Sequence, residues 1–355
     1  MAKRIIVACG GTGGHTFPGL AVAQELRLRG HEVVVWNSGR SIEKSVMRSW
    51  DGPTFATGAK QLAAKNMFAN AMSVFRCMRE MRRFKPNALL AMGSYSSLPP
   101  VLAAWWKGIP VALHEANTIP GRAIEVLSRC AKVVGVSFDV TRKYLPRCKT
   151  ALTGLPVRGG IVDQPRFNDV PRTAFTVFIT GGSQGAHRIN ELVMQAMPIV
   201  KRELDARGEA GNLYVIHQTG AADEEAVRSC YASLGIASRV NAFEREMGRA
   251  FSTANYVVCR AGASTCFELA SVGKSCLFIP LPGAIKNHQH FNADAFVRAG
   301  AAAEAIQDQI TPRALANNII FQYDHPAKRA EAEARMKALA VPDAASRVAA
   351  LVENL

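Results

Sequence analysis

The sequence predicts an α/β protein made of two Rossmann-like, doubly wound domains that face one another across a cleft. Short apolar runs alternate with helical stretches along most of the 355 residues, which indicates βαβ units and parallel sheets. A strand, a glycine-rich loop and a helix follow one another twice, at 4–15 (RIIVACGGTGGH) and 173–187 (TAFTVFITGGSQGAH). Because ligands bind outside the carboxyl ends of strands in such sheets, two of these domains would form a site in the cleft.

The first half of the chain predicts one domain over residues 1–155. Its first strand leads into a helix that we expect from about Pro18 to Arg29, because proline suits the first turn of a helix. A stretch rich in glycine, proline and charge later interrupts the pattern, and we interpret residues 156–172 as a linker. Between this helix and the linker, five apolar runs predict buried strands: EVVVW, ALLAM, PVALH, KVVGV and KTALT.

The second half repeats the pattern and predicts another domain over residues 173–340. From about residue 311 onward the sequence indicates helices only. We expect its last part, 341–355, to be a helix that can pack back on the N-terminal domain. Five apolar runs predict the strands of this half: TAFTVFI, NLYVIH, RVNAF, NYVVC and SCLFIP.

The eight cysteines indicate a reducing compartment. They form no CxxC pair, and most lie in or beside apolar runs, where a free thiol acts as a small hydrophobic group. We therefore expect a cytoplasmic protein without a zinc site. We also expect no transmembrane span, because the long uncharged window at 88–106 is interrupted by Gly93 and by Pro99–Pro100.

The formal net charge of +15 predicts anionic partners, such as phosphorylated substrates, nucleic acid or the acidic surface of a membrane. Residues 60–86 carry seven lysines and arginines but one glutamate, and their apolar residues recur at roughly helical spacing. Two interpretations remain open: a core-packed helix with a solvated basic face, or a helix that docks on anionic lipid. The apolar positions are Leu62, Phe68, Met72, Phe75, Met78 and Met81.

The first glycine loop contains Gly10, Gly11, Gly13 and Gly14 and is followed by His15. Its glycines allow main-chain N–H groups to approach a ligand, and the following helix start adds partial positive charge, so a phosphate is the expected guest. The dinucleotide fingerprint is broken at its third glycine, which argues against a nicotinamide cofactor. His15 can take a proton from a hydroxyl nucleophile; a capping histidine without chemistry is the alternative.

The second half of the chain offers a similar set of hydrogen-bond donors for a phosphate group. Its glycine loop adds the hydroxyl of Ser183 to the backbone N–H groups. Ala263, Ser264 and Thr265 begin a helix after another strand and can present donors to a diphosphate. Glu268, one turn further, can accept hydrogen bonds from both ribose hydroxyls, although a solvent-facing glutamate remains the alternative.

The stretch NHQHFNAD at 287–294 clusters polar side chains after a strand. His288 and His290 do not share a helix face, which argues against a metal site. We expect Gln289 to bind a sugar hydroxyl instead.

Seven motifs in this order resemble the MurG family of bacterial peptidoglycan glycosyltransferases, over essentially the whole chain. The resemblance implies the GT-B fold and transfer of N-acetylglucosamine (GlcNAc) from UDP-GlcNAc to the MurNAc C4 hydroxyl of undecaprenyl-pyrophosphoryl-MurNAc-pentapeptide (lipid I), which gives lipid II. It also implies peripheral attachment to the cytoplasmic face of the inner membrane, with other cell-wall synthesis proteins as further candidate partners. The motifs are GGTGGH, GSYSSLP, HEAN, GLPVR, GGSQGA, CRAGASTCFE and HQxxNA.

The resemblance also implies individual site residues. In contact with UDP-GlcNAc it places Thr12, Gly13, Gly14, Asn117, Arg158, Ser183, Ala263, Ser264, Thr265, Cys266, Phe267, Glu268 and Gln289. Glu244 stands where the family usually has an isoleucine against uracil, which puts the packing of uracil in question. GSYSS and HEAN also depart from the commoner GGYVS and HEQN, but Tyr95, Glu115 and Asn117 are kept. The catalytic candidates are therefore His15, Glu115 and Tyr95.

Direct displacement at an anomeric carbon needs one base and strong stabilisation of the departing diphosphate, and it inverts the α-linked donor. We hypothesise that His15 is the base, with Glu115 as its rival. The acceptor's pyrophosphate is expected on the first glycine loop, at Gly10, Gly11, Gly13, Gly14 and His15. Helix starts, Arg158 and hydroxyl donors can stabilise the leaving group, so we expect no metal site and no tightly bound cofactor.

Other functions predict other sequence features. A glycolipid glycosyltransferase with another acceptor, or a UDP-GlcNAc epimerase, could use similar loops, but the order of the seven motifs argues against the epimerase. A basic nucleic-acid-binding protein would place aromatic stacking platforms among its basic clusters. Aromatic residues make up only 7% of the chain and show no such pattern, so we expect no nucleic acid partner.

Overall fold

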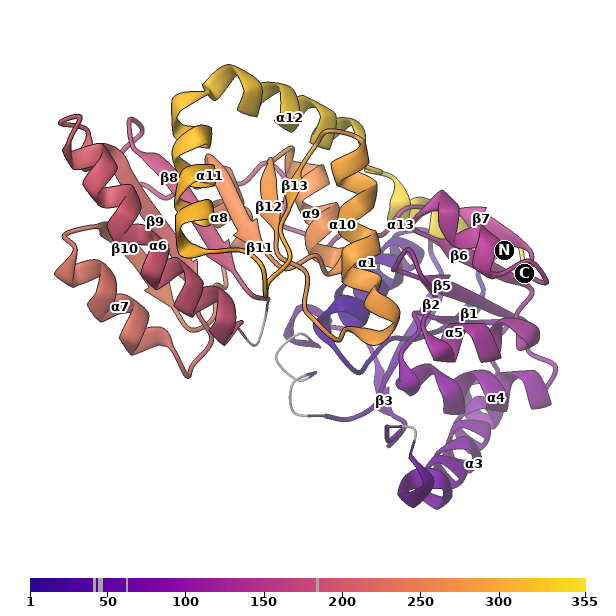
Figure 1. Ribbon diagram of the computed structural model, residues 1–355. Helices are drawn as coiled ribbons and strands as arrows, with labels where there is room; N and C mark the ends of the chain where they lie inside the picture. The colour runs from indigo at the N-terminus through magenta and orange to yellow at the C-terminus, as the bar shows by residue number, and fades with distance from the viewer. Residues whose placement is uncertain (41–42, 44–46, 62, 183–184) are drawn as a thin grey trace. The chain divides into compact units, whose positions relative to one another are not determined.

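The computed structural model describes residues 1–40, 43, 47–61, 63–182 and 185–355. The chain divides into two compact units (Figure 1). Residues 1–159 and 341–355 form the first unit, and residues 160–340 form the second. The stretch expected as a linker, 156–172, is thus shared between them, and the last residues of the chain belong to the first unit.

The first unit is built around a parallel sheet. Its strands are β1 (Arg4–Ala8), β2 (Glu32–Asn37), β3 (Thr54–Ala56), β4 (Ala88–Ala91), β5 (Val111–Glu115), β6 (Val133–Val136) and β7 (Thr150–Leu152). In the described part of the chain their order is β3-β2-β1-β4-β5-β6-β7. Ile5 of β1 lies opposite Val33 of β2 and Ala88 of β4. The central strands are buried on both faces, which explains why they read as continuous apolar runs.

The helices of the first unit flank this sheet (Figure 1). They are α1 (Gly13–Leu28), α3 (Met67–Phe84), α4 (Leu98–Trp106), α5 (Arg122–Leu127) and α13 (Ala344–Glu353). The prediction that the first helix begins near Pro18 was wrong, because α1 already begins at Gly13. Thr12 is its extended N-cap residue, and Pro18 lies inside the helix. Two glycines of the loop therefore form the first turn of α1.

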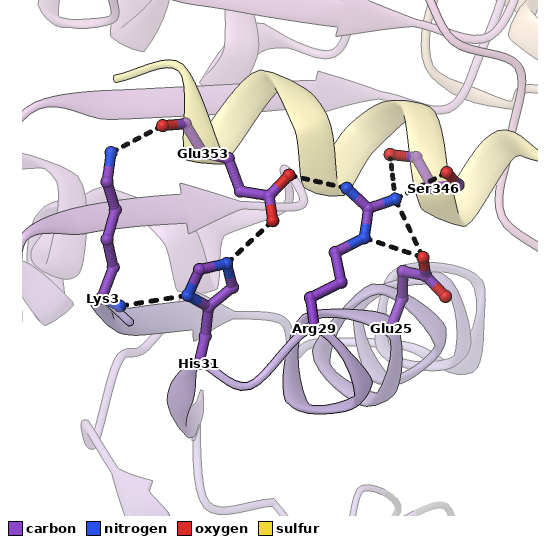
Figure 2. Close-up of polar contacts among 6 residues, drawn as sticks. All are labelled: Lys3, Glu25, Arg29, His31, Ser346 and Glu353. Atoms are coloured by element: carbon purple, nitrogen blue, oxygen red, sulfur yellow. Dashed lines mark hydrogen bonds and ion pairs between the residues drawn. The ribbon is translucent and has the colours of Figure 1, made fainter. Parts of the chain in front are cut away.

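The last helix, α13, is held against α1 by a set of polar contacts that Figure 2 shows. The Glu353 carboxylate accepts hydrogen bonds from Arg29 Nη1 at 2.6 Å and from His31 Nε2 at 2.8 Å. His31 Nδ1 accepts the backbone N–H of Lys3 at 3.0 Å, so its neutral tautomer with the proton on Nε2 satisfies both contacts. We name these four residues the α13 clasp. The end of the chain is thereby fixed to the element that follows the first glycine loop.

The second unit has the same plan. Its strands are β8 (Phe175–Thr180), β9 (Leu213–Gln218), β10 (Ala237–Asn241), β11 (Tyr256–Cys259), β12 (Cys276–Phe278) and β13 (Ala303–Glu304). Their order among the described residues is β10-β9-β8-β11-β12-β13, and all pairs are parallel. The helices are α6 (His187–Asp205), α7 (Glu224–Ser233), α8 (Met247–Thr253), α9 (Ala263–Val272), α10 (His288–Arg298), α11 (Pro312–Asp324) and α12 (Pro326–Ala338). Thus two Rossmann-like domains are present.

Each sheet reverses its strand order at one place, and this place identifies where a ligand can bind. In the first unit the reversal lies between β1 and β4, and in the second between β8 and β11. Crevices at such switch points, outside the carboxyl ends of the strands, are the usual ligand sites of doubly wound sheets. Both glycine loops lie at a switch point, because they follow β1 and β8 directly.

Among the helices of the described residues, none is long and apolar enough to cross a membrane.

Candidate active site

The first glycine loop is held by a glutamate that the sequence did not single out. Glu43 Oε1 accepts the backbone N–H of Gly11 at 2.5 Å and the hydroxyl of Ser38 at 2.6 Å. Its Oε2 accepts the N–H groups of Gly39 at 2.8 Å and Arg40 at 3.1 Å. Glu43 is 2% exposed. The Gly11 N–H, which was expected to face a pyrophosphate, is therefore used within the protein, and no sequence signature marks Glu43.

The loop after β4 packs directly on the first glycine loop. A Cβ atom on Gly11, whose φ is +96°, would lie 2.3 Å from Ser94 Oγ, so only glycine fits there. Ser94 itself has φ +66° and ψ 165°, a conformation that is essentially confined to glycine. Tyr95 follows it, and its hydroxyl accepts a hydrogen bond from Arg40 Nη1 at 3.2 Å. Strained backbone of this kind concentrates at functional sites.

His15 lies in the first turn of α1, among the ends of three neighbouring strands. Its Nδ1 is 2.9 Å from the hydroxyl of Thr12. A Cβ on Gly93, just after β4, would be 3.6 Å from His15 Cδ2 and 3.6 Å from the carbonyl oxygen of His114 on β5. The His15 side chain is half-buried. The structure thus brings His15 together with Thr12 and with the chain segments after β4 and in β5, within the first unit.

The two residues at the end of β5 are buried and have different roles. His114 Nε2 donates to the carbonyl of Gly154 at 3.0 Å, and burial lowers the pKa of His114 to about 4, so the ring is neutral at pH 7. Glu115 Oε1 accepts from Asn117 N at 2.8 Å, and Oε2 accepts from Gly121 N at 2.9 Å. Burial raises the pKa of Glu115, although these hydrogen bonds oppose that shift. Glu115 therefore shapes the loop that carries Asn117.

Arg158, predicted to contact the donor, belongs to the first unit. Its guanidinium lies over the ring of Phe17, 4.7 Å from the ring centroid. Because Phe17 is in the first two turns of α1, this cation–π contact holds Arg158 beside the helix that carries His15.

The second glycine loop is held from β9. Gln218 Nε2 donates to the carbonyl of Gly182 at 2.6 Å, and Gly182 N donates to Thr180 Oγ1 at 3.1 Å. Gly185 has φ +74°, and a Cβ there would lie 2.0 Å from the carbonyl oxygen of Thr219. The loop is thus in van der Waals contact with the turn after β9. Ser183, predicted to bind the donor, lies outside the described residues.

The start of α9 presents part of the predicted donor set. Ser264 and Thr265 are half-buried in its first turn, after the N-cap residue Gly262. Glu268 follows one turn later and is 4% exposed. Ala263 is buried at the helix start. Backbone N–H groups and hydroxyls therefore come together at the switch point of this sheet.

Two other residues of α9 that were predicted to contact UDP-GlcNAc have side chains that face the core instead. Cys266 is fully buried, and Phe267 packs edge-to-face against Phe296 with ring centroids 6.0 Å apart. Their side chains are thus part of the hydrophobic core of the second unit. A donor contact at either position would have to come from the backbone.

The start of α10 carries Gln289. Its Oε1 accepts the backbone N–H of Leu281 at 2.9 Å. Lys286 and Asn287, immediately before α10, both adopt left-handed backbone with φ +55° and +54°. Asn292, one turn into the helix, donates from Nδ2 to the carbonyl of Ala261 at 3.1 Å and so ties α10 to the loop before α9.

The histidines of this segment do not assemble a metal site. His290 pairs with Glu304, with 2.6 Å between Nδ1 and Oε1. Over the part of the chain that the structure describes, no group of three His, Cys, Asp or Glu side chains could hold a metal ion.

Glu244 is committed to its own loop. Its Oε2 accepts from Asn241 Nδ2 at 2.9 Å, and its Oε1 accepts from Glu246 N at 2.8 Å. It also lies 3.5 Å from Arg239 Nε, and its side chain is 3% exposed. A uracil contact at this position would therefore come from the backbone, not from the carboxylate.

Comparison with known proteins identifies the family. The glycosyltransferase family 28 N-terminal domain matches residues 5–136, and the C-terminal domain of the same family matches residues 176–348. A crystal structure of Acinetobacter baumannii MurG is 30% identical, with a TM-score of 0.78 and full coverage of both chains. The chain belongs to the MurG family.

Curated relatives agree with this assignment. A protein of Myxococcus xanthus is 36% identical and covers 99% of this chain and 93% of its own length. One of Geobacter sp. (strain M21) is 35% identical, with 98% and 95% coverage. Both are named UDP-N-acetylglucosamine–N-acetylmuramyl-(pentapeptide) pyrophosphoryl-undecaprenol N-acetylglucosamine transferase.

The two-domain architecture of the MurG family is shared more widely. A UDP-GlcNAc 2-epimerase from Neisseria meningitidis matches with a TM-score of 0.71 over 99% of this chain, but at 13% identity. This similarity is one of fold alone. The GT-B architecture predicted from the sequence is confirmed.

Proposed function

We infer that this protein transfers GlcNAc from UDP-GlcNAc to the MurNAc C4 hydroxyl of lipid I and so makes lipid II for peptidoglycan. The observation that carries this conclusion is the match along nearly the whole chain to relatives named for that transfer. The glycine loops at both switch points support it, because a pyrophosphate acceptor and a nucleotide donor each require an anion site.

His15 is the base in this proposal. If Thr12 Oγ1 accepts the proton on His15 Nδ1, the ring keeps its lone pair on Nε2, and a neutral imidazole of this tautomer can take the proton of the attacking hydroxyl. Thr12 then acts as a positioning residue that fixes the tautomer. The hydroxyl oxygen forms its bond to C1 of GlcNAc as the bond from C1 to UDP breaks, which inverts the anomeric centre.

Glu115 is a weaker candidate for the base. Its two carboxylate oxygens accept hydrogen bonds from Asn117 and Gly121, and it is 3% exposed. A carboxylate that already organises a loop in this way is poorly placed to reach a substrate hydroxyl. In the proposal it therefore positions Asn117 for the donor sugar, while Tyr95 lines the acceptor side.

The second unit binds the donor in this proposal. The departing diphosphate gains stabilisation from backbone N–H groups of the second glycine loop, from the N-terminus of α9 and from the hydroxyls of Ser264 and Thr265. Glu268 holds the ribose hydroxyls, and Gln289 binds the sugar. Uracil is contacted by the backbone at Glu244.

The acceptor's pyrophosphate is placed at the start of α1, on Gly13, Gly14 and His15. Gly10 and Gly11 shape the approach to this position. The N–H of Gly11 is left out, because Glu43 accepts it.

Transfer of labelled GlcNAc from UDP-GlcNAc to a short-chain lipid I analogue tests the function. UDP-GlcNAc hydrolysis and epimerisation are followed in the same samples. The expected result is a disaccharide product that depends on the analogue. Binding of UDP-GlcNAc without transfer would retain the donor site and reject this acceptor, and epimerised product would reject the reaction class.

The first unit also carries a surface that we propose docks on anionic lipid. On α3, Phe68 is 80% exposed and Phe75 is 62% exposed, and Trp106 at the end of the neighbouring α4 is 75% exposed. The buried stripe of α3 consists instead of Asn70, Ser73, Cys77 and Met81. Of the apolar positions noted in the sequence, Met78 and Met81 pack in the core, whereas Phe68, Met72 and Phe75 are exposed. Leu62 of the same prediction lies outside the described residues.

Apolar side chains standing among arginines suit a membrane interface. Arg76, Arg79, Arg82 and Arg83 follow the exposed aromatics along α3. Aromatic groups insert at the level of the headgroups, while basic residues attract acidic lipid, and the two effects add. Attachment of this kind would keep the enzyme beside its lipid-linked acceptor.

Co-sedimentation with vesicles tests this docking. Vesicles that contain anionic lipid should sediment the protein, and the double variant Phe68→Ser, Phe75→Ser should lose most of this binding. Val126→Ser, at another exposed apolar position of the first unit, is the control. Equal sedimentation with neutral and anionic vesicles would contradict the proposal.

A further inference from the structure

A continuous line of hydrogen bonds runs behind the second glycine loop. It begins at the buried hydroxyl of Tyr231 on α7, which is 2.8 Å from His217 Nδ1. His217 Nε2 is 3.0 Å from Asn190 Oδ1. Asn190 Nδ2 then donates to Asp223 Oδ2 at 2.7 Å. The line ends where Asp223 Oδ1 accepts from His187 Nδ1 at 2.8 Å. We name these five residues the relay.

The chemistry of the groups fixes the direction of each bond. Asn190 Oδ1 can only accept, so His217 carries its proton on Nε2 and accepts from the Tyr231 hydroxyl on Nδ1. Burial lowers the pKa of His217 to about 3 and raises that of Tyr231 well above its usual range, so both stay neutral. Every buried polar side-chain atom along the relay thus makes at least one hydrogen bond. A buried network that is satisfied in this way is rigid.

Asp223 holds an unusual position in this arrangement. It is the N-cap residue of α7, where an aspartate ordinarily accepts a backbone N–H of its own helix. Here the Asp223 side chain makes no such cap and turns instead to α6. The hydrogen bonds of the Asp223 carboxylate are therefore made to α6 and not to the backbone of α7.

The side chain of Asn190 connects the relay to the glycine loop through the peptide group of Thr219. Asn190 Nδ2 also donates to the carbonyl of Thr219 at 2.8 Å. The same carbonyl oxygen is the atom on which Gly185 packs, since a Cβ there would approach it to 2.0 Å. Asn190 is fully buried. A shift of Asp223 or Asn190 would consequently move the surface against which the glycine loop rests.

We propose that Asp223 is a positioning residue for the donor, which acts through Asn190 and the Thr219 carbonyl to fix the position of Gly185 in the second glycine loop. The proposal rests on the function inferred above, in which this loop binds the UDP part of UDP-GlcNAc. His187, at the start of α6, supports Asp223 from the solvent side, and Glu191 and Arg188 are the other charged groups beside it.

Three variants separate this role from a general one. Asp223→Ser keeps a residue that suits the N-cap but is too short to reach Asn190 and His187. Asp223→Asn keeps an acceptor for Asn190 and offers an amide N–H to a neutral His187. Glu224→Gln removes a charge from the next residue, which pairs with Arg228 and not with the relay, and is the matched control.

UDP binding by calorimetry and steady-state transfer kinetics are measured for each variant. Asp223→Ser should bind UDP about tenfold more weakly, with kcat at saturating UDP-GlcNAc within about twofold of the parent. Asp223→Asn and Glu224→Gln should stay within about twofold in both. Unchanged UDP affinity in Asp223→Ser, or equal weakening in Glu224→Gln, would overturn the proposal. If the parent protein itself does not bind UDP, the result rejects the proposed function, and this outcome is distinct from a failure of the Asp223 proposal alone.

Discussion

The two glycine loops follow the first strand of their sheets at equivalent switch points, but different groups hold them. A carboxylate holds the first loop directly, because Glu43 accepts the N–H of Gly11 at 2.5 Å. The second loop is contacted by neutral groups, with the Gln218 amide on the carbonyl of Gly182 and the Thr180 hydroxyl on its N–H. Its nearby carboxylate, Asp223, acts from behind and is paired with His187.

In the proposed function, the difference in charge gives the two loops different tasks. A buried carboxylate against Gly11 repels a second anion at that position, so the first loop can accept a pyrophosphate only further along, at the start of α1. The second loop has no carboxylate in contact with its described residues. We infer that the first loop positions the base and the acceptor, whereas the second binds the donor's diphosphate.

The largest expected effect comes from removing the base on the first side. His15→Ala should lower kcat for transfer by a factor of about 10² to 10⁴, the usual contribution of general base catalysis. Its affinity for UDP, measured by calorimetry, should be unchanged. His325→Ala, at a half-buried histidine between α11 and α12 of the second unit, is the control. Near-normal turnover in His15→Ala would remove His15 from this role.

A smaller effect is expected at the support of the first loop. In the parent protein, the backbone N–H groups of Gly39 and Arg40 donate to Oε2 of Glu43. Glu43→Gln replaces one carboxylate oxygen by an NH2 group, so that N–H donors face one another. We expect kcat to fall about tenfold, since buried donors lose their acceptor, while UDP affinity stays the same. The control is Asp51→Asn, at a carboxylate that is 86% exposed. A loss of UDP affinity in Glu43→Gln would contradict the division of tasks between the loops.

The helices that follow the two loops extend the comparison. α6 packs against α11 through apolar side chains, whereas the α13 clasp adds charged contacts to α1 (Figure 2). Hydrogen bonds from His31 and Arg29 outweigh the effect of burial and lower the pKa of Glu353. A carboxylate whose pKa is lower in the folded state than in the unfolded state stabilises the fold at pH values above the unfolded-state pKa. This stability is lost as the pH falls through the folded-state pKa.

The smallest effect is therefore expected in stability. Glu353→Gln should lower the free energy of unfolding by about 1 kcal/mol at pH 7. The difference from the parent should be smaller at pH 3, since this stability is lost as the pH falls through the lowered folded-state pKa of Glu353. Thermal unfolding at both pH values measures this. Asp343→Asn, at a 54% exposed residue just before α13, should have little effect at either pH. An equal loss at pH 7 and pH 3 would show that the charge is not responsible.

The sequence predicted the buried strands better than the edge strands. The run KTALT does form β7, but it was expected to be buried and none of its three residues is, because β7 lies at the edge of the sheet. The runs EVVVW and ALLAM coincide with β2 and β4, because a parallel strand covered on both faces must be apolar throughout. β3 was missed, since its three residues lie at the edge of the sheet and none is buried. β10 lies two residues earlier than predicted, because its burial pattern is mostly partial.

The orientation of α3 shows a limit of apolar periodicity. Its buried side includes Ser73, whose hydroxyl donates to the carbonyl of Thr57 at 2.8 Å, and Asn70, whose Oδ1 accepts the N–H of Lys60 at 2.9 Å. These polar residues bind neighbouring backbone and so belong inside. The apolar side chains of Phe68 and Phe75 are left outside, so the apolar spacing alone does not tell the two faces of α3 apart.

The site divides in a similar way. The positions of the glycine loops, of His15 and of the start of α9 at the ends of strands were predictable, because glycines after a strand and hydroxyls at a helix start have a local signature. The supporting residues Glu43 and Asp223 have none. Each acts on a loop more than 30 residues away in the sequence, and their roles follow only from the tertiary structure.

The division of tasks between the loops is tested most directly by a matched pair of variants, Gly11→Ala and Gly185→Ala. Both glycines have positive φ, and a Cβ would lie 2.3 Å from Ser94 Oγ in one and 2.0 Å from the Thr219 carbonyl oxygen in the other. UDP binding is measured by calorimetry for each. The account predicts that Gly185→Ala loses UDP affinity while Gly11→Ala keeps it and loses transfer. Loss of UDP affinity in Gly11→Ala, with normal affinity in Gly185→Ala, would contradict it.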